Sequence, residues 1–229
     1  MMFRSALVAA ALACLPTASL AAPSAPIEAP PAPAPAKAAE AKAEKPAPAN
    51  VVGKAAPDFT LKDLDGKDVK LSSFKGKVVV LEWFNPGCPY VKKSHTAGSL
   101  IDTAKKHTAK GVVWLAINSG AAGKQGHEPR MNAESAKTWA MGHPILSDVD
   151  GTVGKSYGAT NTPHMFVIDK KGVVAYAGAI DNSPDAERKS PEGGTLINYV
   201  DAAVAAVSAG KAVKTAQTKA YGCSVKYGS

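Results

Sequence analysis

The hydrophobic positions from about residue 51 onward fall into short groups whose spacing predicts alternating strands and helices. Two nearly continuous apolar runs are typical of central strands that are buried on both faces of a sheet. Two further runs follow, the first opened by the Thr162–Pro163 pair and the second by the Lys171–Gly172 turn. The predicted strands are residues 77–84, 111–118, 162–169 and 173–180.

Three segments carry the end signals or the periodicity of helices. Pro89 stands at the position where a proline suits the first turn of a helix. Asn132 is the type of residue that caps a helix start, and Gly210 is the type that ends one. The predicted helices are residues 89–107, 132–141 and 195–209, the last of them rich in Ala and Val and amphipathic.

A β-hairpin is predicted before these elements. Residues 56–61 alternate between apolar and polar, the Asp65–Gly66 pair suits a tight turn, and residues 69–71 resume the apolar pattern. Strand and helix then alternate, and the chain continues with two strands and a helix. This order predicts an α/β fold in which a central mixed sheet is flanked by helices and extended by the N-terminal hairpin.

The first 21 residues have the pattern of a secretory signal peptide. A basic start that ends at Arg4 precedes an apolar run, which is too short for a membrane span and which Pro16 interrupts. Residues 11–14 also resemble a lipoprotein signal, in which Cys14 would carry the lipid. The sequence therefore predicts export, to the periplasm or beyond the cell, either as a free protein or as a membrane-anchored lipoprotein.

The remainder of the chain divides into a linker and one domain. Residues 22–50 contain almost only Ala, Pro, Lys and Glu, which is too little apolar bulk for a core and predicts a disordered, fairly stiff linker. Residues 51–229 have a normal size for a single domain, and their polar tail begins at about residue 210.

The charge of the chain is basic but dispersed. Lys and Arg total 27 against 19 Asp and Glu, which gives a net charge of +8. Aromatic residues do not interleave with a basic cluster, so the sequence argues against nucleic-acid binding. Mild attraction to an anionic membrane surface fits this pattern better.

Cys88 is the leading candidate for chemistry. It lies between a predicted strand and a predicted helix, where the free N–H groups of the helix start would stabilise a thiolate. The thiolate is the nucleophilic form, and a free Cys has a pKa of roughly 8.5. Lys92 and Lys93 lie about one turn further along. The alternative is that Cys88 is half of an inert disulfide, because only Cys223 remains with it once a signal peptide is removed.

Several stretches resemble the redoxin branch of the thioredoxin superfamily, which holds the alkyl hydroperoxide reductase/thiol-specific antioxidant proteins and the exported thioredoxin-like reductases. The resemblance covers residues 52 to about 209. The matching stretches are residues 52–66, 72–77 and 161–169, while residues 85–91 and 221–227 are similar to a narrower, peroxiredoxin-like subgroup with one Cys at the thioredoxin position. The resemblance implies a thioredoxin-like fold and a thiol–disulfide oxidoreductase or thiol-based antioxidant without an organic cofactor.

The resemblance also implies a role for the Thr162–Pro163 pair. In thioredoxin-like folds this peptide bond is cis, the loop faces the active-site Cys, and the loop backbone pairs with the polypeptide substrate. Thr162, Pro163 and His164 are therefore candidate substrate-binding residues, with His164 as a polar residue that lines the groove. From the residues alone, an ordinary trans turn remains an alternative.

Glu82 interrupts an apolar strand six residues before Cys88, where thioredoxin has a buried Asp that helps proton transfer at its second Cys. A carboxylate in such a strand is costly unless it is paired or protonated. Glu82 is therefore either a proton relay, and so a candidate catalytic residue, or the partner of Lys77 or another Lys in a structural ion pair. His95 lies on about the same helix face as Cys88 and is expected to be solvated.

Direct peroxide reduction is not predicted, despite the resemblance to peroxide-reducing proteins. A peroxidatic Cys would align with position 91, which holds Val91. Such a site also needs a Thr or Ser at the position of Cys88 and a nearby Arg, and the first strand–helix unit contains no Arg. A reactive thiol at Cys88 would still be oxidised slowly by peroxide.

Cys223 lies in a tail whose flanking residues Tyr221, Gly222 and Ser224 predict a defined path. We expect this tail to fold back over the active site and to present Cys223 as the resolving thiol. Cys88 would attack a polypeptide or small-molecule disulfide, or be oxidised to a sulfenate. Cys223 would then form the Cys88–Cys223 disulfide, which an external thiol reductant of the cell envelope would reduce.

Two alternatives without catalysis remain open. A permanent Cys88–Cys223 disulfide would staple the fold and contribute on the order of 4–5 kcal/mol for so long a loop. Otherwise the thiols would take part in binding Cu(I), which soft thiolate and thioether ligands suit. The candidate ligands are Cys88, Cys223 and His164, with Met165, His95 or His127 nearby.

Overall fold

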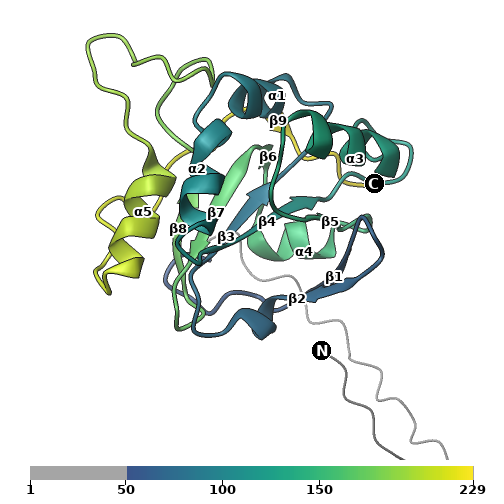
Figure 1. Ribbon diagram of the computed structural model, residues 1–229, viewed down its shortest axis with the longest axis horizontal. Coiled ribbons are helices and arrows are strands. Elements are labelled where there is room, and N and C mark those ends of the chain that lie inside the picture. The colour runs from purple at the N-terminus through teal and green to yellow at the C-terminus, as the bar shows by residue number, and fades with distance from the viewer. Residues whose placement is uncertain (1–50, 229) are drawn as a thin grey trace, which may run out of the picture. The chain divides into compact units, whose positions relative to one another are not determined.

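The computed structural model describes residues 51–228 and builds them around a seven-stranded sheet (Figure 1). The predicted signal peptide at 1–21, the candidate lipid site Cys14 and the predicted linker at 22–50 lie outside the described residues. No helix within residues 51–228 is long and apolar enough to cross a membrane.

The strands are short and are connected mostly by helices and tight turns. They are β1 (Thr60–Asp63), β2 (Asp68–Lys70), β3 (Val79–Trp83), β4 (Val113–Asn118), β5 (Ile145–Ser147), β6 (Asn161–Thr162), β7 (His164–Ile168), β8 (Val174–Gly178) and β9 (Cys223–Ser224). The helices are the 3₁₀ helix η1 (Leu71–Phe74), α1 (Pro89–Thr96), α2 (Leu100–Thr108), α3 (Pro129–Thr138), α4 (Thr152–Tyr157) and α5 (Tyr199–Ser208).

The main sheet is mixed, with the strand order β2-β1-β5-β4-β3-β7-β8. Strands β3, β4 and β5 are parallel, and the hairpin β1–β2 and the pair β7–β8 extend the sheet antiparallel at its two edges. The predicted fold class, a thioredoxin-like α/β fold with an N-terminal hairpin, is confirmed. Strands β6 and β9 form a separate two-stranded pair.

Strand β3 is buried on both faces, which explains its continuous apolar pattern. Leu81 and Trp83 join the core that α4 covers, where the Trp83 ring lies 5.4 Å from the Tyr157 ring. Val80 joins the core on the opposite face, beneath α2 and α5. Successive side chains of a strand point to opposite faces, so one strand supplies both cores.

The predicted helix at 89–107 is interrupted, and α1 and α2 are separate helices. Gly98 lies in the break, where an added Cβ would stand 2.2 Å from the carbonyl oxygen of Ala186. The loop that carries Ala186 therefore approaches too closely for a side chain at this position. The need for a glycine in this break thus comes in part from a contact with a distant segment, which the local pattern does not report.

Asn132 is not the N-cap that the sequence predicted. Helix α3 begins at Pro129, with Glu128 as its N-cap residue. The buried Asn132 side chain accepts a hydrogen bond from the Asn118 amide at 2.8 Å and donates one to the carbonyl oxygen of Gly126 at 2.9 Å. Asn132 thus ties the Gly-rich loop to the end of β4 instead of starting the helix.

Strand β1 begins later than predicted, at Thr60, and two short elements were not predicted. Strand β5 has three residues and α4 has six, which is too short for a period of two or of 3.6 to be recognised. The Asp65–Gly66 turn is confirmed, and Gly66 has a φ of 80° that favours glycine.

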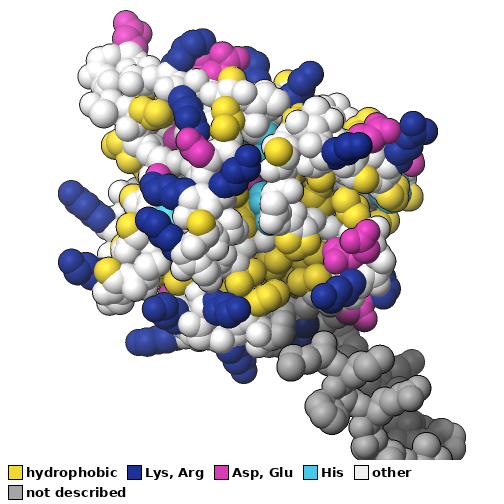
Figure 2. All heavy atoms as spheres, viewed as in Figure 1, with side chains coloured by type: hydrophobic (Ala, Val, Ile, Leu, Met, Phe, Trp, Pro, Cys, Tyr) yellow, Lys and Arg dark blue, Asp and Glu magenta, His cyan; other side chains and the backbone are white. Residues whose placement is uncertain are grey.

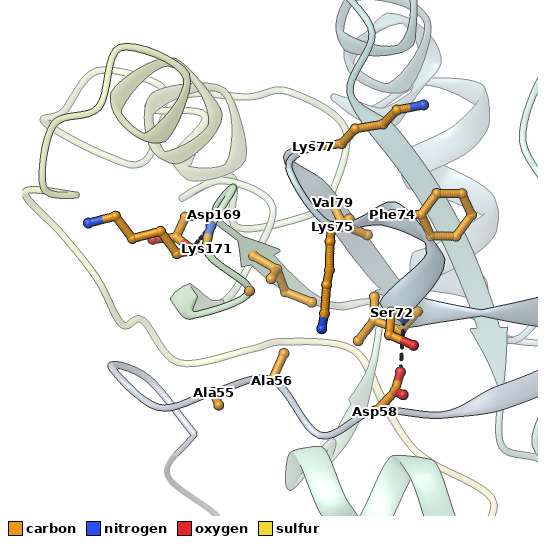
Figure 3. A pocket seen from close by; sticks show the side chains of 13 residues that line it. Ala55, Ala56, Asp58, Ser72, Phe74, Lys75, Lys77, Val79, Asp169 and Lys171 are labelled. Atoms are coloured by element: carbon orange, nitrogen blue, oxygen red, sulfur yellow. Dashed lines mark hydrogen bonds between the residues drawn. The ribbon is translucent and has the colours of Figure 1, made fainter.

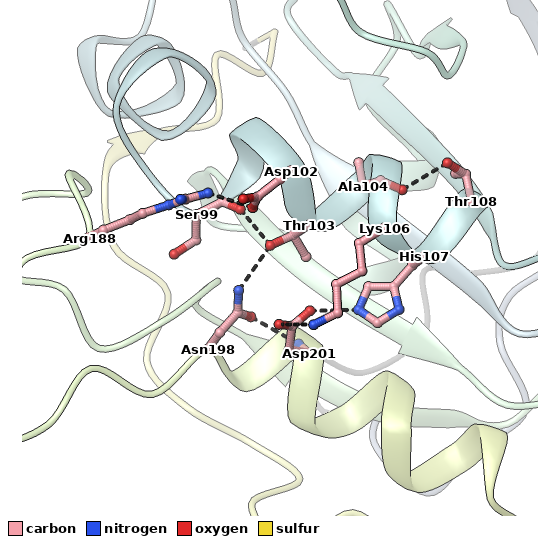
Figure 4. Close-up of polar contacts among 10 residues, drawn as sticks. All are labelled: Ser99, Asp102, Thr103, Ala104, Lys106, His107, Thr108, Arg188, Asn198 and Asp201. Carbon is pink, nitrogen blue, oxygen red and sulfur yellow. Dashed lines mark hydrogen bonds and ion pairs between the residues drawn. The ribbon is translucent and has the colours of Figure 1, made fainter. Parts of the chain in front are cut away.

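Polar contacts hold α2 against α5 and the loop around residue 188 (Figure 4). Asp201 of α5 accepts hydrogen bonds from Lys106 at 2.7 Å and from the His107 ring at 2.6 Å. Arg188 donates to Asp102 at 2.5 Å. Helix α2 follows closely after α1, which begins at Pro89 and has Cys88 as its N-cap residue.

Candidate active site

Cys88 is the N-cap residue of α1 and lies just beyond the carboxyl end of β3. The turn that precedes it is shaped by Asn85, whose side-chain oxygen accepts a hydrogen bond from the Gly87 N–H at 2.8 Å. The Cys88 side chain is 0% exposed, so solvent does not reach it in this arrangement. The predicted position of this thiol at a strand-to-helix turn is confirmed.

The Thr162–Pro163 peptide bond is cis, as the resemblance implied. Strand β7 runs antiparallel to β3 with His164 opposite Trp83, so the start of β7 lies beside the carboxyl end of β3. This register brings the Thr162 carbonyl oxygen to 3.0 Å from Cys88 Sγ. As a thiol, Cys88 donates its S–H to that oxygen.

The tail returns to the same place from the far end of the sequence. Strand β9 pairs antiparallel with β6, and this register sets Cys223 opposite Thr162. Cys223 Sγ lies 2.7 Å from Cys88 Sγ, and both residues are free cysteines. The structure thus brings together four of the predicted site residues, namely Cys88, Cys223, Thr162 and Pro163.

The two thiols have different acidities. Burial alone would raise the pKa of Cys88, but hydrogen bonds from the Cys223 thiol and from the backbone N–H groups of Val91 and Cys223 lower it below its ordinary value. Burial, and then the neighbouring Cys88, raise the pKa of Cys223 to about 11. The thiolate therefore forms first on Cys88, at the start of α1, where the helix N–H groups point to it.

Glu82 is completely buried, and its partner is a histidine rather than a lysine. Its two carboxylate oxygens accept hydrogen bonds from His95 Nε2 at 2.7 Å and from Trp114 Nε1 at 3.0 Å. Burial would raise the pKa of Glu82, but the charge and the hydrogen bond of His95 hold it below its ordinary value. The predicted pairing with Lys77 or another Lys is wrong, because β3 directs Glu82 beneath α1, where His95 and not a lysine faces it.

His95 is buried and not solvated as the sequence predicted. Its ring stacks on Trp139 at 5.3 Å and lies 5.8 Å from the Phe84 ring. His143 adds a second buried imidazole, with Nε2 3.9 Å from Glu82. Burial lowers the pKa of His143 to about 4, so this ring is neutral near pH 7. The burial of His95 could have been predicted from Glu82, since a carboxylate in a buried strand requires a partner that donates hydrogen bonds to it.

His164 is the first residue of β7, directly after the cis proline, and its ring packs on the Phe166 ring with 4.5 Å between the ring centres. Its Nδ1 accepts a hydrogen bond from the Thr160 N–H at 3.3 Å, and burial lowers its pKa to about 4. Among residues 51–228, no group of three or more His, Cys, Asp or Glu side chains is arranged to hold a metal ion. The Cu(I) alternative therefore has no such ligand set within this part of the chain.

A cavity of about 260 Å³ lies at the other end of the sheet (Figure 3). The cavity is lined by Lys75, by the first residue of β3, Val79, and by the last residue of β7, Ile168. Cys88 lies beyond the opposite, carboxyl end of β3. The cavity is therefore separate from the thiol site. Lys and Arg side chains are spread over the face of the molecule in Figure 2 rather than gathered in one cluster.

The comparisons with known proteins agree with this geometry. The redoxin family model matches residues 51–193. Thiol-disulfide oxidoreductase ResA of Geobacillus thermodenitrificans (strain NG80-2) is 35% identical over 128 residues, which are 55% of this chain and 68% of the relative. The chloroplastic peroxiredoxin Q of Triticum aestivum is 33% identical over an alignment of 135 residues, and the match covers 54% of this chain and only 57% of the relative.

Two solved structures share the fold over most of their length. A hypothetical protein from Sinorhizobium meliloti 1021 is 28% identical with a TM-score of 0.67, and the match covers 78% of this chain and 95% of that one. An uncharacterized conserved protein from Geobacillus kaustophilus is 30% identical with a TM-score of 0.66, and the match covers 77% of this chain and 92% of that one. The shared architecture thus extends beyond the residues that the family model matches.

Proposed function

The chain belongs to the redoxin family and is an enzyme of the thiol–disulfide oxidoreductase type, and from this premise we propose that Cys88 is its nucleophile and Cys223 its resolving thiol. The observation that carries the proposal is the distance of 2.7 Å between the two sulfur atoms. A disulfide bond is roughly 2.05 Å long, so the sulfurs need only a small shift to form one.

The reaction has two exchange steps. The Cys88 thiolate attacks one sulfur of a substrate disulfide, forms a mixed disulfide and releases the first substrate thiolate. Cys223, after losing its proton, attacks Cys88 Sγ and displaces the second substrate thiolate, which leaves the Cys88–Cys223 disulfide. The substrate has gained two electrons and the enzyme has lost them, and an external dithiol returns them in the same two steps.

The residues around the thiols support this division of roles. The lowered pKa of Cys88 favours it as the attacking thiolate, and the raised pKa of Cys223 keeps that residue protonated until the mixed disulfide has formed. The Thr162 carbonyl and the cis Pro163 form the wall on which the reacting sulfur of the substrate would lie, and His164 follows them in the chain as the first residue of β7. We assign these three residues to substrate binding.

Glu82 is proposed to act through α1 rather than as a proton carrier. Both of its oxygens are occupied by His95 and Trp114, so it joins the last turn of α1 to β3 and β4 and fixes the helix that has Cys88 as its N-cap residue. Direct peroxide reduction is not part of the proposal, because Val91 occupies the position where the peroxidatic Cys of such proteins would align.

The surroundings of the reaction are proposed from the sequence. The signal-peptide pattern of residues 1–21 supports work outside the cytoplasm, with or without a lipid on Cys14. There, an envelope thiol reductant would regenerate the reduced enzyme, and disulfides would be common substrates.

The test is the reduction potential of the Cys88–Cys223 pair, measured by thiol trapping and mass spectrometry across a series of glutathione or dithiothreitol buffers. We expect a value between about −120 and −270 mV, which is the range of known redox catalysts. A bridge that resists reduction below about −300 mV would instead be a structural staple. Cys88→Ser should remain folded and lose all reaction with glutathione disulfide, while Cys223→Ser should stop at the mixed disulfide.

A further inference from the structure

The tail occupies the exposed edge of β6 immediately before the cis proline. Cys223 stands opposite Thr162 and Ser224 opposite Asn161 in antiparallel register. The backbone N–H of Val225 donates to the Thr160 carbonyl oxygen at 3.0 Å, and the side-chain amide of Asn161 donates to the Gly222 carbonyl oxygen at 3.1 Å. The tail is therefore an added β-strand that carries a Cys at the site of chemistry.

An extended polypeptide that binds at a free strand edge uses the same backbone hydrogen bonds. To react with Cys88, the Cys of a polypeptide disulfide must bring its sulfur to the place where Cys223 Sγ now lies. Its backbone would then lie along Asn161 and Thr162, where β9 already lies. The tail and a polypeptide substrate therefore compete for one position.

Resting on the proposed function, we infer that β9 is a built-in competitor for polypeptide disulfides and that the substrate of the enzyme with its tail in place is a low-molecular-weight disulfide. A small disulfide needs only the Cys223 sulfur to turn away from Cys88. A polypeptide reacts only after residues 222–228 have left the edge of β6.

Gly222 offers a way to move the tail without removing a thiol. It has a φ of 98°, which favours glycine, and an added Cβ would stand 2.3 Å from the Thr162 carbonyl oxygen. Backbone and not a flexible side chain blocks that Cβ, so Gly222→Ala should detach β9. Gly228→Ala is a matched control in the same tail, because its Cβ would only contact Ala121 at 3.5 Å.

The experiment measures the rate of mixed-disulfide formation at Cys88 with oxidised glutathione and with insulin, using mass spectrometry. Cys223→Ser is the background, so that the reaction stops after one exchange: Cys88 bonds to one substrate sulfur and the other leaves as thiolate. We expect Gly222→Ala to raise the ratio of the insulin rate to the glutathione rate about tenfold or more. Gly228→Ala should leave this ratio unchanged.

A second variant, truncated after Tyr221, removes the strand outright and should raise the ratio at least as much as Gly222→Ala. An unchanged ratio in both variants, with a measurable glutathione rate, would overturn the competition by β9 and leave the proposed function intact. Absence of any Cys88-dependent reaction with oxidised glutathione would overturn the proposed function itself, and the inference with it.

Discussion

The anchoring of the tail by Tyr227 gives a prediction whose size follows from the contacts. The Tyr227 hydroxyl donates to the Ala159 carbonyl oxygen at 2.8 Å. Its ring lies where a Cβ on Gly151 or Gly154 would stand, and Lys155 Nζ is 5.6 Å from the ring centre. Because Cys88 is buried partly by this tail, loss of the anchor should expose it.

Two substitutions at Tyr227 should have graded effects. Tyr227→Phe removes only the hydrogen bond and should weaken tail docking by about 1 kcal/mol. Tyr227→Ala also removes the half-buried ring and its contact with Lys155, for a total of about 2–3 kcal/mol. If Cys88 reacts only from the open state, its rate of modification rises roughly fivefold in the first variant and roughly 30- to 150-fold in the second.

The assay is the alkylation of Cys88 under native conditions by a maleimide that carries a polyethylene glycol chain, in a Cys223→Ser background, followed by mass spectrometry. Unlike a small disulfide, this reagent is too large to reach Cys88 while the tail is docked. Urea denaturation of each variant is the control, since a loss of global stability of the same size would explain the exposure without any release of the tail. Equal alkylation rates for Tyr, Phe and Ala at position 227 would refute the reasoning, because Cys88 would then be shielded by something other than the docked tail.

Three further predictions concern the buried Gly154, the buried carboxylate of Glu82 and the pH dependence of stability through His143. Gly154→Ala should increase Cys88 alkylation, because the added Cβ would lie 2.4 Å from the Tyr227 hydroxyl. This effect should outweigh the gain of about 1 kcal/mol in helix propensity. Gly142→Ala, which has open space around it, is the control and should leave the alkylation rate unchanged. Glu82→Gln should lower the free energy of unfolding by about 3 kcal/mol in urea, since it breaks a buried pair with His95, and unchanged stability would argue against the positioning role. Burial holds the pKa of His143 at about 4, against 6.5 in the unfolded chain. As the pH drops, the unfolded chain therefore takes up a proton at His143 before the folded protein does. The free energy of unfolding should fall between pH 6.5 and pH 4, by at most about 3 kcal/mol. His143→Asn should remove this part of the acid sensitivity, and an identical pH profile for both proteins would contradict the assignment.

The thiol pair shows how far a sequence pattern reaches. Cys88 follows an apolar run and precedes a proline that starts a helix, and those neighbours are enough to place it at a strand-to-helix turn. That Cys223 returns to it was inferred from the residues around Cys223. The register that sets Cys223 opposite Thr162 was not inferred, because it depends on backbone hydrogen bonds between segments about sixty residues apart.

The elements that the sequence alone determined are those with a strong local pattern. The buried strands β3 and β4, the hairpin turn at Gly66 and the start of α1 at Pro89 follow from periodicity and from backbone preferences, which act within a few residues. The thioredoxin-like order of the elements followed from these.

Only the tertiary structure decided which buried groups meet. His95 looked like an exposed helix residue, yet the packing of α1 on β3 turns it onto Glu82. The close approach of Ala186 to Gly98 and the hydrogen bond from Tyr227 to Ala159 likewise join segments that are distant in the sequence. Such contacts are selected by how the whole core packs, and no local propensity records them, since the free energy that fixes them is shared among residues brought together only by folding.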